Sequence, residues 1–259
     1  MVCSWFENIM NSISAVILVG GVGSRFSAIN EPPKQLSKLN KNIILINIMN
    51  NFKRFGLNHF IFPLGSKKSF FIKFFNDQKN IKKYNFNIIK NGFKNHKLQP
   101  NKINISYFDA GENTKKFVRI KKSFNYTDNS DMLVAYGDDL ANVNLKNLIK
   151  KYNLTNKKKA IVTTYKKRSQ YGHLIVNKSG DVKKFIEKPP HEHPINIGFY
   201  LFPKKILMSY NKKNLELESH FLPKLTKLNL LKSYEHKGYF YSINDKKELM
   251  NAKIKLKNL

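Results

Sequence analysis

A glycine-rich loop followed by two cations is the part of this sequence whose residues could do chemistry. An apolar run over 15–19 leads into Gly20-Gly21-Val22-Gly23-Ser24-Arg25, and Pro32-Pro33-Lys34 follows. Glycines let backbone N–H groups approach a phosphate chain closely, because no Cβ stands in the way. Arg25 can bind phosphate oxygens as a planar fork and Lys34 as a point charge. The order predicts a strand, a phosphate-binding loop and a cationic clamp for a nucleoside triphosphate.

The spacing of these glycines excludes two other phosphate-binding motifs. A Walker A loop needs G-x-x-x-x-G-K-[ST], and no such Lys-Ser/Thr pair follows here. A dinucleotide-binding loop needs G-x-G-x-x-G, and position 26 is Phe26. An ordinary strand-to-helix turn with two solvated cations is the simpler alternative. The Arg and the Pro-Lys that follow the glycines favour the phosphate site.

A second glycine break carries two carboxylates. Apolar residues 132–135 precede Tyr136-Gly137-Asp138-Asp139, and a helix is expected after them, around 143–152. A carboxylate at a strand's carboxyl end, opposite a triphosphate loop, can hold Mg²⁺ against the phosphates. Asp138 is therefore the predicted metal ligand. Asp139 is expected to cap the next helix instead.

The elements that must position these residues alternate along the chain. We expect strands over 15–19, 58–64, 104–108 and 132–136, with helices near 43–55, 68–75 and 115–123. Such alternation predicts an α/β domain, whose mostly parallel sheet has helices on both faces and a ligand site at the strands' carboxyl ends. After residue 159 the pattern becomes strand-rich, with strands expected over 160–165, 173–177, 182–185 and 195–202.

The composition of the chain limits which kinds of binding partner and which cellular location we expect. Lys and Arg number 47 against 17 Asp and Glu, a net charge of +30, but lysines are spread from Lys34 to Lys257. Such a surface attracts polyanions weakly, so no specific nucleic acid is expected. Cys3 is the sole cysteine, which excludes a disulfide framework and fits a cytoplasmic location. Residues 1–14 read as an N-terminal extension rather than a signal peptide, and no apolar run has membrane-spanning length.

Several segments together resemble the sugar-1-phosphate nucleotidyltransferases, and among them the glucose-1-phosphate cytidylyltransferase branch. The matching segments are AVILVGGVGSR (15–25), PPKQL (32–36), FDAGENTKKFVRIKK (108–122), YGDDLANVNLKNL (136–148), FIEKP (185–189), INIGFYLF (195–202) and YEHKGYF (234–240). The resemblance implies a Rossmann-like core in one domain over 15–259. Its nucleotide-binding half covers about 15–155 and its strand-rich sugar-phosphate half about 156–259.

The resemblance also implies an activity and its residues. The activity is Mg²⁺-dependent transfer of CMP from CTP to a sugar 1-phosphate, with release of pyrophosphate, in surface polysaccharide synthesis by a homo-oligomer. The implied nucleotide-binding residues are Leu18, Val19, Gly20, Gly21, Val22, Gly23, Ser24, Arg25, Lys34, Thr114, Arg119 and Gly137. Arg25, Lys34 and Asp138 would act in catalysis. The sugar phosphate would meet Glu187, Lys188, Asn196 and Gly198, and the metal would meet Asp138 and Asn244.

Three departures from the family pattern keep alternatives open. The family's M-T-G-G-R is Lys115-Lys116-Phe117-Val118-Arg119 here, and its N-G-G is Asn196-Ile197-Gly198. The position of a second metal carboxylate holds Asn244, with Asp245 beside it. The alternatives are another nucleotide or acceptor, such as GTP with a heptose phosphate, and a catalytically degenerate relative that binds ligand.

Overall fold

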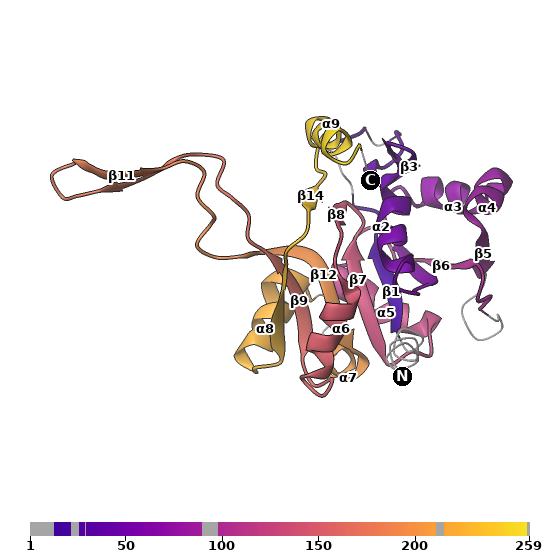
Figure 1. Cartoon of the computed structure of the whole chain (residues 1–259). Coiled ribbons are helices and arrows are strands. Elements are labelled where there is room, and N and C mark those ends of the chain that lie inside the picture. Colours follow the sequence, from indigo (N-terminus) through magenta and orange to yellow (C-terminus); the bar gives the residue numbers. More distant parts are fainter. Residues whose placement is uncertain (1–12, 22–25, 29, 90–97, 211–214, 258–259) are drawn as a thin grey trace.

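An eight-stranded sheet forms the centre of the computed structural model, which describes residues 13–21, 26–28, 30–89, 98–210 and 215–257 (Figure 1). Its strands are β1 (Ile13–Leu18), β4 (His59–Leu64), β5 (Phe86–Ile89), β6 (Ile103–Asp109), β7 (Asp131–Tyr136), β9 (Ala160–Tyr165), β12 (Ile195–Pro203) and β13 (Leu231–His236). They are ordered β13-β9-β12-β7-β1-β4-β6-β5. β12 is antiparallel to both neighbours and every other pair is parallel.

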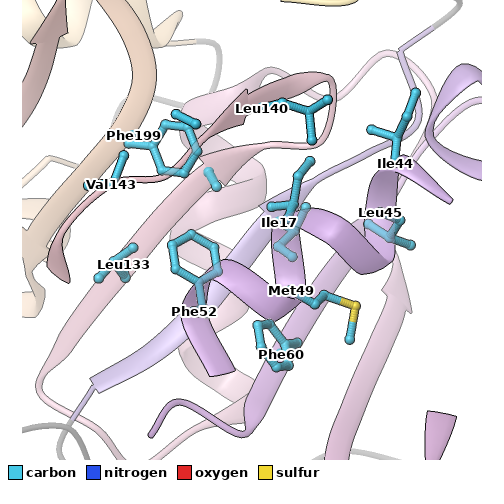
Figure 2. Packing of buried hydrophobic residues seen from close by; sticks show 14 of the residues in the cluster. Ile17, Ile44, Leu45, Met49, Phe52, Phe60, Leu133, Leu140, Val143 and Phe199 are labelled. Atoms are coloured by element: carbon cyan, nitrogen blue, oxygen red, sulfur yellow. The ribbon is translucent and has the colours of Figure 1, made fainter. Parts of the chain in front are cut away.

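Helices cover both faces of the sheet because the central strands are apolar on both sides. In β1, Ala15 and Ile17 belong to one buried cluster and Val16 to another, as alternation along a strand requires. The first cluster includes α2 (Ile44–Lys53), α6 (Leu145–Asn153) and α9 (Lys246–Lys255), and the second includes α5 (Lys116–Ser123) and α8 (Leu222–Lys227). Figure 2 shows Phe52 of α2 among the core side chains on this face of the sheet. Its ring centroid lies 5.9 Å from that of Phe199.

The structure confirms the predicted α/β class and most of the expected elements. The four predicted strands before residue 140 correspond to β1, β4, β6 and β7. One boundary differs from the expectation, and the arrangement of the second half becomes clear. β1 begins at Ile13, so the sheet takes in two residues of the expected N-terminal extension. The strands β9, β12 and β13 of the second half extend the central sheet, so one continuous sheet spans both halves.

The chain has further helices and short strands outside the central sheet. They are η1 (Lys34–Leu36), β2 (Lys38–Leu39), β3 (Asn42–Ile43), α3 (Lys68–Asn76), α4 (Gln78–Tyr84), η3 (Phe124–Tyr126), β8 (Asp139–Ala141), α7 (Lys204–Met208), η4 (Leu217–Phe221) and β14 (Phe240–Ser242). β8 pairs with β14, and β2 with β3. None of the helices within the described ranges has the length and apolar character that a membrane crossing requires.

A hairpin of β10 (His173–Val176) and β11 (Val182–Ile186) projects from the body (Figure 1). We call residues 168–190 the arm; its base is closed by an isolated bridge between Arg168 and Pro190. All of β10 is exposed, and so is β11 except for the half-buried Ile186. The exposed side chains include Leu174 and Phe185, which pair across the hairpin.

Candidate active site

A cavity of about 860 Å³ opens at the carboxyl ends of β1 and β7. Its wall includes the strand ends Leu18 and Tyr136 and residues of the segment 112–119. Within the described ranges its lining includes five cations, which are Lys34, Lys67, Lys115, Lys116 and Arg119. The volume lies in the range of small-molecule sites, and the location is the one that the strand order favours.

Two glycines allow close backbone contacts at the end of β1, one with the segment after β4 and one with the end of β7. Gly20 has a φ of +86°, and a Cβ there would lie 2.6 Å from the backbone nitrogen of Gly65. Gly137 donates its N–H to the carbonyl of Leu18 at 3.0 Å, and a Cβ there would lie 2.9 Å from the same oxygen. Only glycine fits either contact. Leu18, Val19 and Gly21 line the cavity, whereas Gly20 and Gly137 are not among its lining residues.

The rest of the predicted glycine loop, Val22-Gly23-Ser24-Arg25, lies outside the described residues. The proposed roles of these four residues, including that of Arg25 in catalysis, therefore stay predictions from the sequence. The described residues on either side do fit a ligand-binding loop. Gly21 and Ser27 both line the cavity.

Lys34 and Asp138 meet in the cavity. The Lys34 Nζ lies 2.7 Å from Asp138 Oδ2, and their side chains are 12% and 28% exposed. Lys34 begins the short helix η1 after Pro33, whose extended backbone turns the chain into the site. The two predicted catalytic residues that the structure describes are thus adjacent. A cation and a carboxylate side by side can bind an anionic ligand and a metal ion respectively.

The donor set around Asp138 fits a magnesium ion held mainly by substrate. Asn244 also lines the cavity, and the backbone N–H of Ile243 donates to the Asp138 carbonyl at 3.0 Å. Asn244 Nδ2 donates to Ser242 Oγ at 3.3 Å, so its amide oxygen is the atom that can serve as a metal ligand. Mg²⁺ is commonly held by one or two carboxylates plus phosphates. In the described ranges no three acidic, His or Cys side chains gather as a metal cluster.

Asp245 does not replace a second metal carboxylate in this structure. Its Oδ1 accepts a hydrogen bond from the backbone N–H of Glu248 at 2.7 Å, which makes Asp245 the N-cap of α9. It is exposed and is not among the cavity residues. Asn244, one residue earlier, is the side chain that faces the cavity.

The expectation that Asp139 caps the next helix is wrong. Asp139 lies in β8, only 7% exposed, and Asn144 caps α6 through a hydrogen bond from the Asn147 N–H. Burial raises the pKa of Asp139 to about 7, and the neighbouring Asp138 carboxylate adds to the rise. The chain continues as a strand here because Asp139 pairs with Ser242 of β14. The residues Gly137-Asp138-Asp139 are typical of a turn, so the sequence analysis did not predict the short pairing of β8 with β14.

Arg119 serves as a positioning residue for the loops of the cavity. It is 7% exposed, and its guanidinium donates to the carbonyls of Val19 at 3.0 Å, Thr114 at 2.8 Å and Glu112 at 3.1 Å. A Cβ at Gly65 would lie 2.2 Å from an Arg119 nitrogen, so that glycine makes room for the guanidinium. Arg119 therefore ties the end of β1 to the segment that carries Thr114.

Lys67 also lines the cavity, and the sequence analysis did not single it out. Its Nζ donates to Ser27 Oγ at 2.8 Å and to the carbonyls of Ala28 at 2.7 Å and Glu31 at 3.2 Å. It thus holds the segment that follows the glycine loop. The position of Lys67 shortly after β4 could have indicated that it lies at the site, because the carboxyl ends of parallel strands share one edge of the sheet.

A hydrogen-bonded network also missed from the sequence crosses the cavity wall. Lys116 is ion-paired with Glu218 and stacks over the ring of Tyr136, whose hydroxyl also donates to Glu218. Tyr136 and Tyr200 hydroxyls lie 3.1 Å apart, and Asn196 Nδ2 donates to the Tyr200 hydroxyl at 2.5 Å. Burial acts to raise the pKa of Glu218, but hydrogen bonds from Lys116 and Tyr136 outweigh it and the pKa falls. Burial raises the pKa of Tyr200 to about 12.

The structure does not bring the predicted sugar-phosphate residues into this cavity. Glu187 and Lys188 lie at the base of the arm, 61% and 60% exposed, and pair with each other at 3.5 Å. Asn196 is also exposed, and it reaches the wall only through Tyr200. Gly198 is buried, with a φ of +73°, and a Cβ there would lie 2.7 Å from the Tyr136 ring. Glu187 and Lys188 thus lie on the arm, whereas Asn196 and Gly198 lie on β12 of the central sheet, and none of the four lines the cavity.

Comparison with known proteins gives the family. A model of the family described as nucleotidyl transferase matches residues 14–247. A Bacillus subtilis protein named probable glucose-1-phosphate cytidylyltransferase is 34% identical over 244 residues, covering 93% of this chain and 94% of the relative. The Salmonella typhimurium glucose-1-phosphate cytidylyltransferase is 26% identical, covering 88% and 90%.

Solved structures agree on the fold. The crystal structure of HddC from Yersinia pseudotuberculosis superposes with a TM-score of 0.66 at 23% identity, covering 94% of this chain and 99% of that one. A UDP-glucose pyrophosphorylase complexed with UDP-glucose superposes with a TM-score of 0.66 at 18% identity, covering 95% and 98%. With a family model spanning most of its length and a relative at 34% identity, this chain belongs to the nucleotidyl transferase family.

Proposed function

We propose that this protein transfers CMP from CTP to glucose 1-phosphate and releases pyrophosphate, in a Mg²⁺-dependent reaction that supplies surface polysaccharide synthesis in the cytoplasm. The observation that carries the proposal is the Lys34–Asp138 pair at 2.7 Å in a cavity at the strands' carboxyl ends. Names of the two similar cytidylyltransferases support the choice of nucleotide and acceptor.

The chain's own residues supply charge and position rather than a covalent step. An oxygen of the acceptor phosphate attacks the α-phosphorus of CTP, the α–β bridging P–O bond breaks, and pyrophosphate leaves on the opposite side. Both reactants are anionic, so cations near the reacting phosphorus lower the barrier. Lys34 is the described cation beside Asp138 and would bind the α-phosphate. No general base is required, because the attacking oxygen is already ionised.

Asp138 and Asn244 are the residues that would hold Mg²⁺. When bound, the ion would neutralise charge on the triphosphate. Asn244 offers a neutral oxygen where an aspartate would offer a charge, so metal affinity should be low. We expect Asn244→Asp to lower the Mg²⁺ concentration needed for half-maximal activity by about tenfold, the scale of one added charge-assisted ligand. Asp245→Ala should leave that concentration unchanged, and the opposite pattern would contradict the assignment.

The proposed activity is tested by measuring the rate of pyrophosphate release for each of four nucleoside triphosphates combined with each of several sugar 1-phosphates. CTP with glucose 1-phosphate should be fastest, and Lys34→Ala should slow it by roughly 10²-fold, the scale for removing one preorganised charge donor. A preference for GTP would assign the chain to another specificity. Absence of turnover at every Mg²⁺ concentration, unrescued by Asn244→Asp, would favour a binding protein instead.

We also propose that the chain assembles as a homo-oligomer. A two-stranded hairpin is marginally stable alone, and the arm exposes Leu174, Ile175, Val176, Val182 and Phe185, each more than half accessible. Packing against a second copy would remove this apolar surface from water. Light scattering on the purified chain gives the oligomeric mass, and a monomer at micromolar concentration would contradict the proposal.

A further inference from the structure

The acceptor side of the cavity needs a cation that the arm does not provide. A phosphate monoester that attacks a triphosphate is repelled by it, so its binding requires positive charge beside the reaction centre. Lys188 lies outside the cavity on an exposed segment, paired with Glu187. Lys116, by contrast, lines the cavity together with Asp138 and has a side chain that is 45% exposed.

Lys116 is held at its position from two directions. Its Nζ pairs with Glu218 and lies 4.4 Å from the centroid of the Tyr136 ring. Tyr136 stands two residues before Asp138, and its hydroxyl donates to the same Glu218. A lysine ammonium has three N–H donors, so Lys116 can keep Glu218 and donate to a ligand as well.

The backbone at Lys116 is fixed by its neighbour in sequence. Phe117 is fully buried against Phe221 of η4, with ring centroids 4.5 Å apart. Glu218 lies in the same element as Phe221. The lysine and its carboxylate therefore stand on two segments packed together, and little side-chain freedom remains to be lost on binding.

We propose that Lys116, positioned by Glu218 and Tyr136, binds the phosphate of the sugar 1-phosphate acceptor, in place of Lys188. The proposal rests on the proposed function. The motif M-T-G-G-R that this segment resembles has threonine at this position, so Lys116 departs from that motif. A charge-assisted hydrogen bond of this kind corresponds to an affinity change of roughly 10- to 100-fold.

The test measures direct binding of glucose 1-phosphate by calorimetry and, alongside it, KM for both substrates. Lys116→Ala should raise the Kd and KM for glucose 1-phosphate at least tenfold, with KM for CTP changed less than threefold and the melting temperature preserved. Lys116→Arg should restore most of the affinity. Glu218→Gln should weaken the binding of glucose 1-phosphate by a smaller factor, because the Lys116 ammonium remains but is less firmly positioned.

A matched control variant distinguishes the loss of acceptor binding at Lys116 from the general effect of losing a surface ion pair. Lys68 pairs with Asp109 at 2.5 Å, with side chains 42% and 53% exposed, outside the cavity. Lys68→Ala should leave acceptor binding unchanged. If Lys188→Ala weakens the acceptor tenfold and Lys116→Ala does not, the inference is wrong while the proposed function stands. If acceptor binding depends on Lys116 but no turnover occurs, the inference stands and the proposed function fails.

Discussion

The cavity wall and the arm use the same kinds of side chain with opposite degrees of packing. In the wall, Lys34 of η1 and Asp138, just after β7, form a pair whose side chains are 12% and 28% exposed. In the arm, Lys188 and Glu187 form a pair that is about 60% exposed, and such surface pairs contribute little to stability. Apolar residues follow the same division, since β7 is buried and β10 is exposed. Sheet packing therefore fixes the geometry of the wall, whereas hairpin pairing alone supports the arm.

Truncating one leucine in each region tests this division with the largest expected effect. Leu133 of β7 is fully buried in the core shown in Figure 2, and Leu174 of β10 is 55% exposed. Leu133→Ala should lower the free energy of unfolding by roughly 2–5 kcal/mol, because it removes buried contacts and leaves a cavity. In the single chain, Leu174→Ala should change it by about 0.5 kcal/mol or less, and a larger loss is expected only where the arm packs against a second copy.

Urea denaturation of both variants gives the comparison. The chain must be measured at a concentration where its oligomeric state is constant, since association adds to apparent stability. A large loss for Leu174→Ala would mean that this face of the arm is buried in the protein in solution. That outcome would also support the proposed homo-oligomer.

The same division explains how much could be predicted from the sequence. Continuous apolar runs such as 132–135 predict buried parallel strands well, and the glycines at their ends point to the cavity. Lys34 and Asp138 were found in this way. Residues 231–236 were not predicted as a strand, because the segment LKSYEH is polar and β13 is an edge strand paired on one side only.

Side chains that reach the cavity from distant segments could not be found from local patterns. Glu218 lies on a π-helical turn, and its role depends on contact with Lys116, 102 positions earlier. Lys188 shows the converse, since the FIEKP motif marks it in the sequence while the fold leaves it on the arm. Motifs therefore identify the strand ends, and long-range packing decides which lysine faces the cavity.

A pair of glycines with positive φ provides the second comparison. Gly198 has a φ of +73°, and a Cβ there would lie 2.6 Å from Asp139 Oδ2 and 2.7 Å from the Tyr136 ring. Gly180 at the arm's tip has a φ of +90° with open space around it. Gly198→Ala should lower the free energy of unfolding by about 2–3 kcal/mol from strain and overlap together. Gly180→Ala carries strain alone and should cost about 1 kcal/mol.

The readout should include activity, because only Gly198 contacts the network behind the cavity. Gly198→Ala should displace Tyr136 and so weaken binding of the sugar 1-phosphate acceptor. Gly180→Ala should leave turnover unchanged. Equal losses of stability in the two variants would show that the crowded site relaxes without cost. The wall would then be less tightly determined than its packing indicates.

The pH dependence of stability distinguishes a buried histidine in the body from an exposed one in the arm. His59 is 3% exposed between Ser14 and Ser106, and burial lowers its pKa to about 4. In the unfolded chain a histidine titrates near pH 6.5, so between these values the unfolded state binds the extra proton. Its contribution is therefore present above pH 6.5 and is lost as the pH falls toward 4, by roughly 2 kcal/mol at pH 5.

Denaturation of wild type, His59→Gln and His173→Gln at pH 7.5 and pH 5 measures this contribution as a difference of slopes. Carboxylates that titrate in the same range affect all three proteins equally, so they cancel in the comparison. His59→Gln should lose about 2 kcal/mol less than wild type on going to pH 5, whatever its stability at pH 7.5. His173 lies on the exposed β10, and His173→Gln should follow the wild type. An unchanged slope for His59→Gln would mean that His59 accepts a proton in the folded sheet, and the core at that position would then be more polar than its burial indicates.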